Sequence, residues 1–381
     1  MKIISIVGAR PNFMKIAPFI RAIQKYNSSE SEKIEHLLLH TGQHYDDRMS
    51  RKFFEELNIP PADIHLGIGS GSQAEQVGRA MIGIEKVIWN EKPDWIVVVG
   101  DVNAILSGAV TAKKEHIKLA HIEAGLRSGD IDMPEEINRL VADRLSDLLF
   151  TPDRIASKNL LNEGMPEERI KFVGNIMIDT FEYEKEKAFA LSLQKVIKNN
   201  LMFEKNLNIE PEKYVLVTLH RPSNVDYPEV LDKLTKFFVE DVSQELPIVW
   251  SVHPRTLNRL TEFGLLDTVK SAKNIVLLHP IGYHEMIKLN SKAKVVLTDS
   301  GGLQEESTVL GTPCLTLRWN TERPVTLTKY GGVSILVGND IDKIKAEYLK
   351  VKSLERNPIR PELWDGRTAE RIVKEIVECR K

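Results

Sequence analysis

Short runs of apolar residues recur along the chain, and each is followed by turn residues and then by a helical pattern. The first half holds six such runs, at residues 3–8, 36–42, 95–101, 117–125, 147–152 and 170–175. The second half holds six more, at residues 214–221, 248–254, 274–280, 293–302, 313–318 and 333–339. Near-continuous apolar strands that alternate with helices indicate parallel sheets covered on both faces. The pattern therefore predicts an α/β protein with two Rossmann-like, doubly wound domains.

A charged, mostly helical segment at residues 181–212 separates the two halves. We expect a first domain over residues 1–178 and a second over residues 179–365. Residues 366–381 predict an amphipathic helix, since its apolar residues recur at the helical period. These are Ala369, Ile372, Val373, Ile376 and Val377. The apolar stripe must be buried, and we expect the helix to pack back on the first domain.

Composition narrows the class of protein further. A chain of 381 residues is too long for one ordinary core, and a formal net charge of −2 gives no electrostatic footprint for nucleic acid or an anionic membrane. Cys314 and Cys379 are the only cysteines, which excludes a disulfide framework and a four-cysteine zinc site. The apolar N-terminus is too short for a signal peptide, and no run approaches a membrane span. We expect a soluble, cytoplasmic protein.

Polar residues follow the predicted strands at most of their carboxyl ends, which is where open α/β sheets bind ligands. They are Arg10, Gln43, His44, Asp101, Glu123, His220, His253, Ser300, Gly301 and Gly302. We expect these side chains, from both domains, to line one central cleft between the domains.

Two of these strand ends have features of anion sites. In "LTDSGGLQEE" (297–306) two glycines precede a helix whose N-terminus would offer free N–H groups. A plain turn capped by Asp299 or Ser300 is an equal alternative. In "VGARPNFMK" (7–15), Arg10 and Lys15 would reach an anionic ligand, or else form a solvated pair at a helix start.

Other signatures are missing from the sequence. No P-loop pattern occurs, and "GIGSGS" (67–72) lacks the spacing of a dinucleotide site. "HTGQH" (40–44) favours a structural or substrate-contacting histidine over a metal ligand, and no nucleophile elbow supports a hydrolase. Asp101, Glu123 and Glu135 remain as a candidate acid–base set, although Glu135 would also complement a helix dipole.

The stretch "HIEAGLRSGDIDMPEEINR" (121–139) contains two of these three carboxylates. Asp130 and Asp132 fit loop charges, and Glu136 fits an ordinary helix-start residue. We expect Arg139 to orient Glu135 or to contact the substrate.

Taken in order, the motifs resemble the non-hydrolysing UDP-N-acetylglucosamine 2-epimerases over nearly the whole chain. They are "GARPNFMKIAP", "HTGQHYD", "VVGD", "HIEAGLRSGD", "MPEEINR", "GN" with "IDT", "LHR", "HP", "LTDSGGLQEE", "GTPCLTLR", "TERP" and "DGRTAERI". The resemblance implies a GT-B type fold and no cofactor or metal. It also implies an isomerase that takes the C2 proton of UDP-GlcNAc, eliminates UDP to 2-acetamidoglucal and adds UDP again to give UDP-ManNAc.

The resemblance also implies roles for individual residues. Those matching catalytic positions are Asp101, Glu123, Glu135 and His220. Those matching substrate-binding positions are Arg10, Lys15, Arg139, Ile281, Met286, Ser300, Gly301, Gly302, Glu306 and Arg323. Those matching the site of a second, activating UDP-GlcNAc are Gln43, His44, Arg221 and His253. The family further suggests a homodimer.

Two segments depart from the pattern of the family, "GDVNAI" after the third predicted strand and "HRPSNVD" after the seventh. They leave open the sugar substituents and the response to an activator. A related UDP-2,3-diacetamido uronate epimerase, a hydrolysing 2-epimerase and, more distantly, a GT-B glycosyltransferase therefore stay as alternatives.

Overall fold

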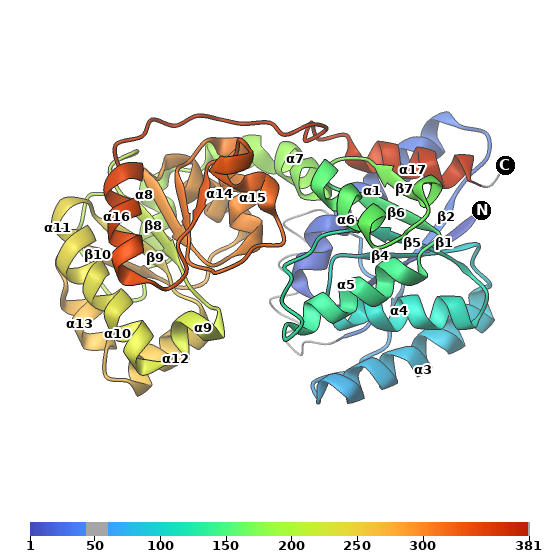
Figure 1. Ribbon diagram of the computed structural model, residues 1–381, viewed down its shortest axis with the longest axis horizontal. Helices are drawn as coiled ribbons and strands as arrows, with labels where there is room; N and C mark the ends of the chain where they lie inside the picture. The colour runs from blue at the N-terminus through green and yellow to red at the C-terminus, as the bar shows by residue number, and fades with distance from the viewer. Residues whose placement is uncertain (43–59, 380–381) are drawn as a thin grey trace. The chain divides into compact units, whose positions relative to one another are not determined.

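The structure, a computed structural model, describes residues 1–42 and 60–379, and for residues 10 and 11 only the backbone. The chain divides into two compact units, Met1–Tyr183 with Pro361–Lys381, and Glu184–Arg360 (Figure 1). Within the described residues each unit is built on one parallel sheet. The α/β fold with two Rossmann-like sheets predicted from the apolar runs is confirmed.

The sheet of the first unit has the order β3-β2-β1-β4-β5-β6-β7. Its strands are β1 (Lys2–Val7), β2 (Glu35–His40), β3 (Ile64–His65), β4 (Trp95–Val99), β5 (Lys118–Ile122), β6 (Leu148–Thr151) and β7 (Ile170–Phe172). Its helices are α1 (Arg10–Ser29), α3 (Gln73–Glu91), α4 (Asn103–Lys114), α5 (Pro134–Leu145), α6 (Arg154–Asn162), η1 (Glu167–Arg169) and α17 (Thr368–Glu378), while α7 (Ile176–Ala190) continues into the second unit. The strand order reverses between β1 and β4, which places a topological switch point there.

Helices cover both faces of this sheet, as its near-continuous apolar strands require. Helices α3, α4 and α5 lie on one face, and α1 lies on the other with α17 against it (Figure 1). Ile4, Ile6 and Val98 of the sheet pack with Ile84 and Ile105 of the helices. The two-residue strand β3 was not predicted, because a pair of residues shows no periodicity.

The C-terminal helix α17 packs on α1 and belongs to the first unit. Four residues of its apolar stripe are buried: Ala369, Ile372, Val373 and Ile376. Its first turn is held by Asp179, whose carboxylate accepts from the backbone N–H groups of Thr368 (3.0 Å) and Ala369 (2.7 Å). A side chain far away in sequence therefore caps this helix.

The second unit has a six-stranded sheet of order β10-β9-β8-β11-β12-β13. The strands are β8 (Val215–Thr218), β9 (Ile248–Ser251), β10 (Ile275–Leu278), β11 (Val295–Thr298), β12 (Cys314–Thr316) and β13 (Ser334–Leu336). The helices are α8 (Leu193–Asn199), α9 (Pro222–Val225), α10 (Pro228–Lys236), η2 (Phe237–Val242), α11 (Ser243–Glu245), α12 (Pro254–Glu262), α13 (Leu266–Ser271), α14 (Tyr283–Lys292), α15 (Gly301–Leu310), η3 (Pro324–Thr326), η4 (Thr328–Tyr330) and α16 (Ile341–Val351). The switch point of this sheet lies between β8 and β11.

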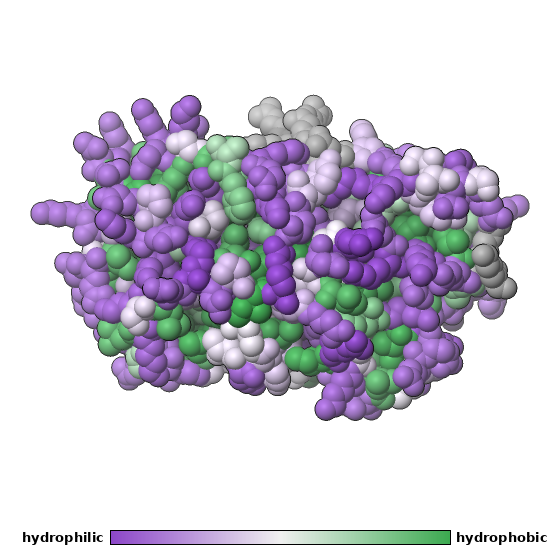
Figure 2. Space-filling view, turned by 90° about the horizontal axis from the view of Figure 1, so that it is seen from above, coloured by the Kyte–Doolittle hydropathy of each residue, from purple (hydrophilic) through white to green (hydrophobic). Residues whose placement is uncertain are grey.

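Hydrophilic residues predominate on the face drawn in Figure 2, and hydrophobic residues appear between them in small groups. Among the residues that the structure describes, no helix is long and apolar enough to cross a membrane.

Gly174 and Gly164 offer a matched test of how the C-terminal segment is held. Both have positive φ angles, +95° and +74°, but a Cβ at Gly174 would lie 2.2 Å from the carbonyl oxygen of Leu363, whereas a Cβ at Gly164 would meet nothing within 4 Å. We expect Gly164→Ala to cost about 1 kcal/mol of unfolding free energy from backbone strain alone. Gly174→Ala should cost roughly 2 kcal/mol more, because the backbone of residue 363 must move. Urea unfolding of both variants measures the difference, and equal losses would contradict the close approach.

Candidate active site

The carboxyl ends of β4 and β5 bring three of the predicted site residues together. The two strands pair in parallel, so their ends lie side by side. Between them is Gly100, with a φ of +79°, where a Cβ would lie 3.0 Å from Nζ of Lys15 and 3.6 Å from Oε2 of Glu123. Asp101 follows directly in the chain. A glycine is required here because its bare Cα lets a cation and a carboxylate approach the backbone.

Glu123 has a conformation that ordinary residues avoid. Its φ of +71° lies in the left-handed region, at a cost of roughly 1–2 kcal/mol for a residue with a Cβ. The side chain is buried, and its Oε2 forms an ion pair with Nζ of Lys15. Its Oε1 is buried too and has no hydrogen-bond partner among the described residues. Backbone strain together with an unsatisfied buried carboxylate oxygen is typical of a functional site.

Arg139 links two carboxylates of this region. Its guanidinium is 1% exposed, with nitrogens 2.6 Å from Oδ2 of Asp101 and 2.6 Å from Oε2 of Glu136. Within the described residues Arg139 pairs with Asp101 and Glu136 rather than with Glu135. Glu136 lies in the first turn of α5, as predicted, but it is also buried and paired with Arg139. Burial alone would raise the pKa of Glu136, but hydrogen bonds from Arg139 and the backbone of Ser128 outweigh it and lower the pKa.

Glu135 differs from its neighbour in having no such partner. Its side chain is half-buried in the first turn of α5 and, within the described part of the chain, makes no hydrogen bond or ion pair. Positions 135, 138 and 139 share one helical face, and Asn138 and Arg139 both reach residue 101. Glu135 therefore lies on the face of α5 that is turned toward the end of β4.

In the second unit, the ends of β8 and β11 pair a histidine with a buried aspartate. Nδ1 of His220 lies 2.8 Å from Oδ1 of Asp299, whose oxygens also accept from the backbone N–H groups of His220 and Arg221. Burial would raise the pKa of Asp299, but the hydrogen bond and charge of His220 outweigh it and lower the pKa. Asp299 thus fixes the orientation of the His220 ring. The other ring nitrogen, Nε2, is the second polar atom of this partly exposed side chain.

The adjacent helix α15 begins with features of an anion site. Ser300 is its N-cap residue but makes no side-chain cap hydrogen bond, and Gly301 and Gly302 form the first turn. A Cβ at Gly301 would lie 2.8 Å from a guanidinium nitrogen of Arg323. Oε1 of Glu322 would lie 2.9 Å from the same Cβ, so Gly301 is needed for the close approach of these two side chains, whereas a Cβ at Gly302 would meet nothing within 4 Å. The dipole at the N-terminus of the helix favours an anion.

Arg323 does not project freely from its loop. It is 6% exposed, with Nε 2.8 Å from Oε1 of Glu305, and it also pairs with Glu322. Beside it lies Glu306, which is buried and has an Oε2 without a hydrogen-bond partner among the described residues. Burial, reinforced by the charge of Glu305, raises the pKa of Glu306 to about 8. Glu306 is therefore a proton donor as well as an acceptor near neutral pH.

The remaining predicted residues lie as follows. Ile281 and Met286 are partly buried against an apolar cluster of the second unit. His253 is the N-cap residue of α12, where Nδ1 accepts from the N–H of Arg255, and its ring centroid is 5.5 Å from that of His220. The side chain of Arg10, and Gln43 and His44 altogether, lie outside the described residues.

Sequence reasoning missed several buried polar residues around the end of β4. His121, Asn138 and Asp143 are each 3% exposed or less, and all three form hydrogen bonds. The signal for His121 was a histidine inside the apolar strand "KLAHI", which was interpreted only as core. Asn138 was detectable by its spacing, one helical turn after Glu135.

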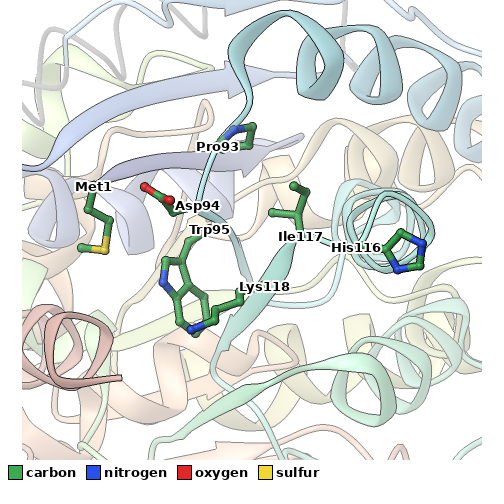
Figure 3. A pocket seen from close by; sticks show the side chains of 7 residues that line it. All are labelled: Met1, Pro93, Asp94, Trp95, His116, Ile117 and Lys118. Atoms are coloured by element: carbon green, nitrogen blue, oxygen red, sulfur yellow. The ribbon is translucent and has the colours of Figure 1, made fainter. Parts of the chain in front are cut away.

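A pocket of about 260 Å³ lies at the amino ends of β4 and β5, away from their polar carboxyl ends. Figure 3 shows its lining, in which Trp95 and Lys118 begin β4 and β5, and Nζ of Lys118 is 5.3 Å from the centroid of the Trp95 ring. None of the predicted site residues lines it. In the described part of the chain, no group of three or more His, Cys, Asp or Glu residues is arranged to hold a metal ion.

Two Rossmann-like units with polar strand ends place the chain in the GT-B class of α/β proteins. Residues 27–377 match the family described as UDP-N-acetylglucosamine 2-epimerase. The chain is 43% identical to the UDP-N-acetylglucosamine 2-epimerase of Methanocaldococcus jannaschii, over 98% of both chains. The crystal structure of the M. jannaschii enzyme in complex with UDP-GlcNAc and UDP superimposes with a TM-score of 0.87, at 41% identity, over 99% of this chain and 100% of that one. The chain belongs to the UDP-N-acetylglucosamine 2-epimerase family.

A further relative is the UDP-2,3-diacetamido-2,3-dideoxy-D-glucuronate 2-epimerase of Pseudomonas aeruginosa. It is 39% identical over 90% of both chains. The similarity to these relatives spans both units. The family resemblance stated from the motifs is confirmed.

The buried Glu306 predicts how the stability of the protein depends on pH. Burial raises the pKa of Glu306 to about 8 in the folded chain, from the ordinary value of 4.5 that a glutamate has in an unfolded chain. Between these values the folded state holds one proton more than the unfolded state, so the unfolding free energy should fall by about 1.4 kcal/mol per pH unit as the pH rises. Urea unfolding from pH 5 to 8 should show this slope in the wild type and a smaller one in Glu306→Gln. An unchanged slope in the variant would contradict the assignment.

Proposed function

We propose that the protein is a UDP-N-acetylglucosamine 2-epimerase, which interconverts UDP-GlcNAc and UDP-ManNAc. The observation that carries the proposal is the convergence of Asp101, Glu123 and Lys15 around Gly100, in a chain that matches the M. jannaschii enzyme over nearly its whole length. Carboxylates held at strand ends are suited to moving a proton at a sugar carbon.

In the first half of the reaction, a carboxylate of the first unit takes the proton from C2 of the sugar. The C1–O bond to UDP breaks as the C1–C2 double bond forms, which leaves 2-acetamidoglucal and UDP. In the second half, UDP attacks C1 again and C2 receives a proton on its other face. Asp101, Glu123 and Glu135 are the candidates for these proton transfers. Lys15 pairs with Glu123 and Arg139 with Asp101, and these contacts orient the two carboxylates.

The second unit supplies the groups that hold the nucleotide. The diphosphate binds at the N-terminus of α15, over Ser300, Gly301 and Gly302, with Nε2 of His220 as a further contact. Negative charge builds up on the departing UDP, so N–H dipoles fixed in place beforehand lower the barrier. Glu306 binds the ribose, with Arg323 beside it, and Ile281 and Met286 pack against the uracil. Arg10 is the remaining cation for the diphosphate.

The same proposal includes a regulatory part. Arg221 and His253, with Gln43 and His44, bind a second UDP-GlcNAc that activates the enzyme, and the protein acts as a homodimer. The tilted contact between the rings of His253 and His220 supports a link between that site and the diphosphate site, because a ligand on one ring would shift the other.

A UDP-2,3-diacetamido uronate is the second candidate substrate. It is favoured by the similarity to the P. aeruginosa epimerase, 39% identical to this chain, which acts on a sugar nucleotide of that kind. The chemistry at C2 is the same for both substrates, so the carboxylates and the diphosphate site serve either one.

The proposed function predicts isotope exchange. The protein incubated with UDP-GlcNAc in D₂O should introduce deuterium at C2 and produce a mixture of gluco and manno sugar nucleotides, as proton NMR would record. A parallel incubation with the diacetamido uronate substrate distinguishes the two candidates by rate. Exchange with neither compound would contradict an epimerase, and release of free ManNAc with UDP would instead identify a hydrolysing enzyme.

Glu123→Gln and Asp101→Asn should each lower the C2 exchange rate by roughly 10²-fold or more, because each removes a group that carries a proton or charge during the reaction. Asp132→Asn is the matched control, since Asp132 is an exposed carboxylate in the loop that leads to α5. Its exchange rate should stay near that of the wild type. Near-wild-type exchange in either of the first two variants would rule out the corresponding role.

A further inference from the structure

The turn that carries Asp101 is held by an uncommon arrangement of side chains. The three consecutive backbone carbonyls of residues 99–101 each accept a hydrogen bond from a different side chain. Asn12, His121 and Asn138 donate to them in that order, over N···O distances of 2.7, 2.8 and 2.8 Å. These donors come from α1, β5 and α5, so three separate elements fix one strand end.

Among these three donors, His121 has a hydrogen-bond partner for each of its two ring nitrogens. It is fully buried, and its Nε2 faces the carbonyl oxygen of Gly100, which can only accept, so Nε2 carries a proton. Its Nδ1 lies 2.6 Å from Oδ1 of Asp143. The other oxygen of Asp143 accepts from the N–H of Gly125 at 3.0 Å and pairs with Arg127 at 2.7 Å.

Asp143 is ionised in this setting. Burial alone would raise its pKa, but the charges and hydrogen bonds of His121 and Arg127 outweigh it and lower the pKa. The ring of His121 therefore joins the ends of two strands: it holds Gly100 after β4 and, through Asp143, Gly125 after β5.

We propose that His121 is a positioning residue for Asp101, which acts through its hydrogen bond to the carbonyl of Gly100. The role rests on the proposed function, since Asp101 is placed there among the catalytic carboxylates. Gly100 is the covalent link between Asp101 and β4, and its left-handed backbone is free of side-chain restraint. Rotation of the peptide that follows it would redirect Asp101, and a displacement of about 1 Å in a catalytic group is enough to cost roughly 10²-fold in rate.

Two substitutions separate this role from a purely structural one. His121→Gln places an amide nitrogen near the position of Nε2, so it keeps a donor for Gly100 and loses the partner of Asp143. His121→Asn places its amide nitrogen near Nδ1, so it keeps the partner of Asp143 and loses the bond to Gly100. The expected result is that kcat falls about 10- to 100-fold in His121→Asn with KM little changed. His121→Gln should keep most of kcat but unfold at lower urea concentration.

The reverse order of kcat values, or equal losses in both variants, would overturn the proposal, because a merely structural network is damaged most when Asp143 loses its partner. ¹⁵N NMR of the wild-type protein gives a readout that needs neither variant to fold. Nε2 of His121 should carry a proton, and a ring without a proton on Nε2 would contradict its hydrogen bond to the carbonyl of Gly100. The wild-type C2 exchange is measured in the same assay, so a failure of the proposed function would appear there, independently of the ring.

Discussion

The site in the first unit depends on opposite charges that are buried next to one another at the carboxyl ends of β4 and β5. Glu123 pairs with Lys15, Asp101 and Glu136 share Arg139, and Asp143 lies between His121 and Arg127. Removing one partner of such a pair leaves an uncompensated charge, at a cost of roughly 3–5 kcal/mol. The charges therefore fix one another's positions: Glu123 cannot move without leaving the buried Lys15 unpaired, and Asp101 is held by the buried Arg139.

This arrangement also explains why strained backbone persists there. Gly100, Glu123 and Gly125 all have positive φ angles, and only Glu123 among them has a side chain. A residue in such a conformation is retained where the surrounding structure determines it from several sides. Here the constraints are the ion pair of Glu123 with Lys15 and the contacts of the buried Asp143 with the N–H of Gly125 and with Arg127. The result is a carboxylate with one oxygen occupied and the other, Oε1, without a hydrogen-bond partner among the described residues, which is the state that a proton acceptor needs.

The fold was largely predictable because parallel strands covered on both faces are near-continuous apolar runs, and here each run is short and followed by turn residues, which favours a strand over a buried helix. The pairing within residues 135–139 was not predictable. Arg139 lies four residues after Glu135 and three after Glu136, and both spacings bring side chains together on a helix. The structure favours Glu136 because its carboxylate turns inward, toward the backbone of Ser128. His121 was hidden for a similar reason, since one polar residue in an apolar strand does not change its pattern.

The buried carboxylates at the ends of β4 and β5 and the buried Asp299 at the end of β11 are satisfied in different ways, and the difference suits the chemistry proposed for each. At the ends of β4 and β5 the carboxylates are paired mainly with side-chain cations. Removing a cation, or protonating its carboxylate partner, changes the local charge. In the second unit Asp299 is bound by two backbone N–H groups and by Asn224 as well as by His220, and the first turn of α15 offers N–H groups that carry no net charge. Charged pairs tune the basicity of the groups that transfer a proton. Backbone dipoles stabilise a departing anion without taking part in proton transfer themselves. A reaction that removes a proton from one carbon and expels a diphosphate from the next requires both kinds of environment, and these two groups of residues supply one each.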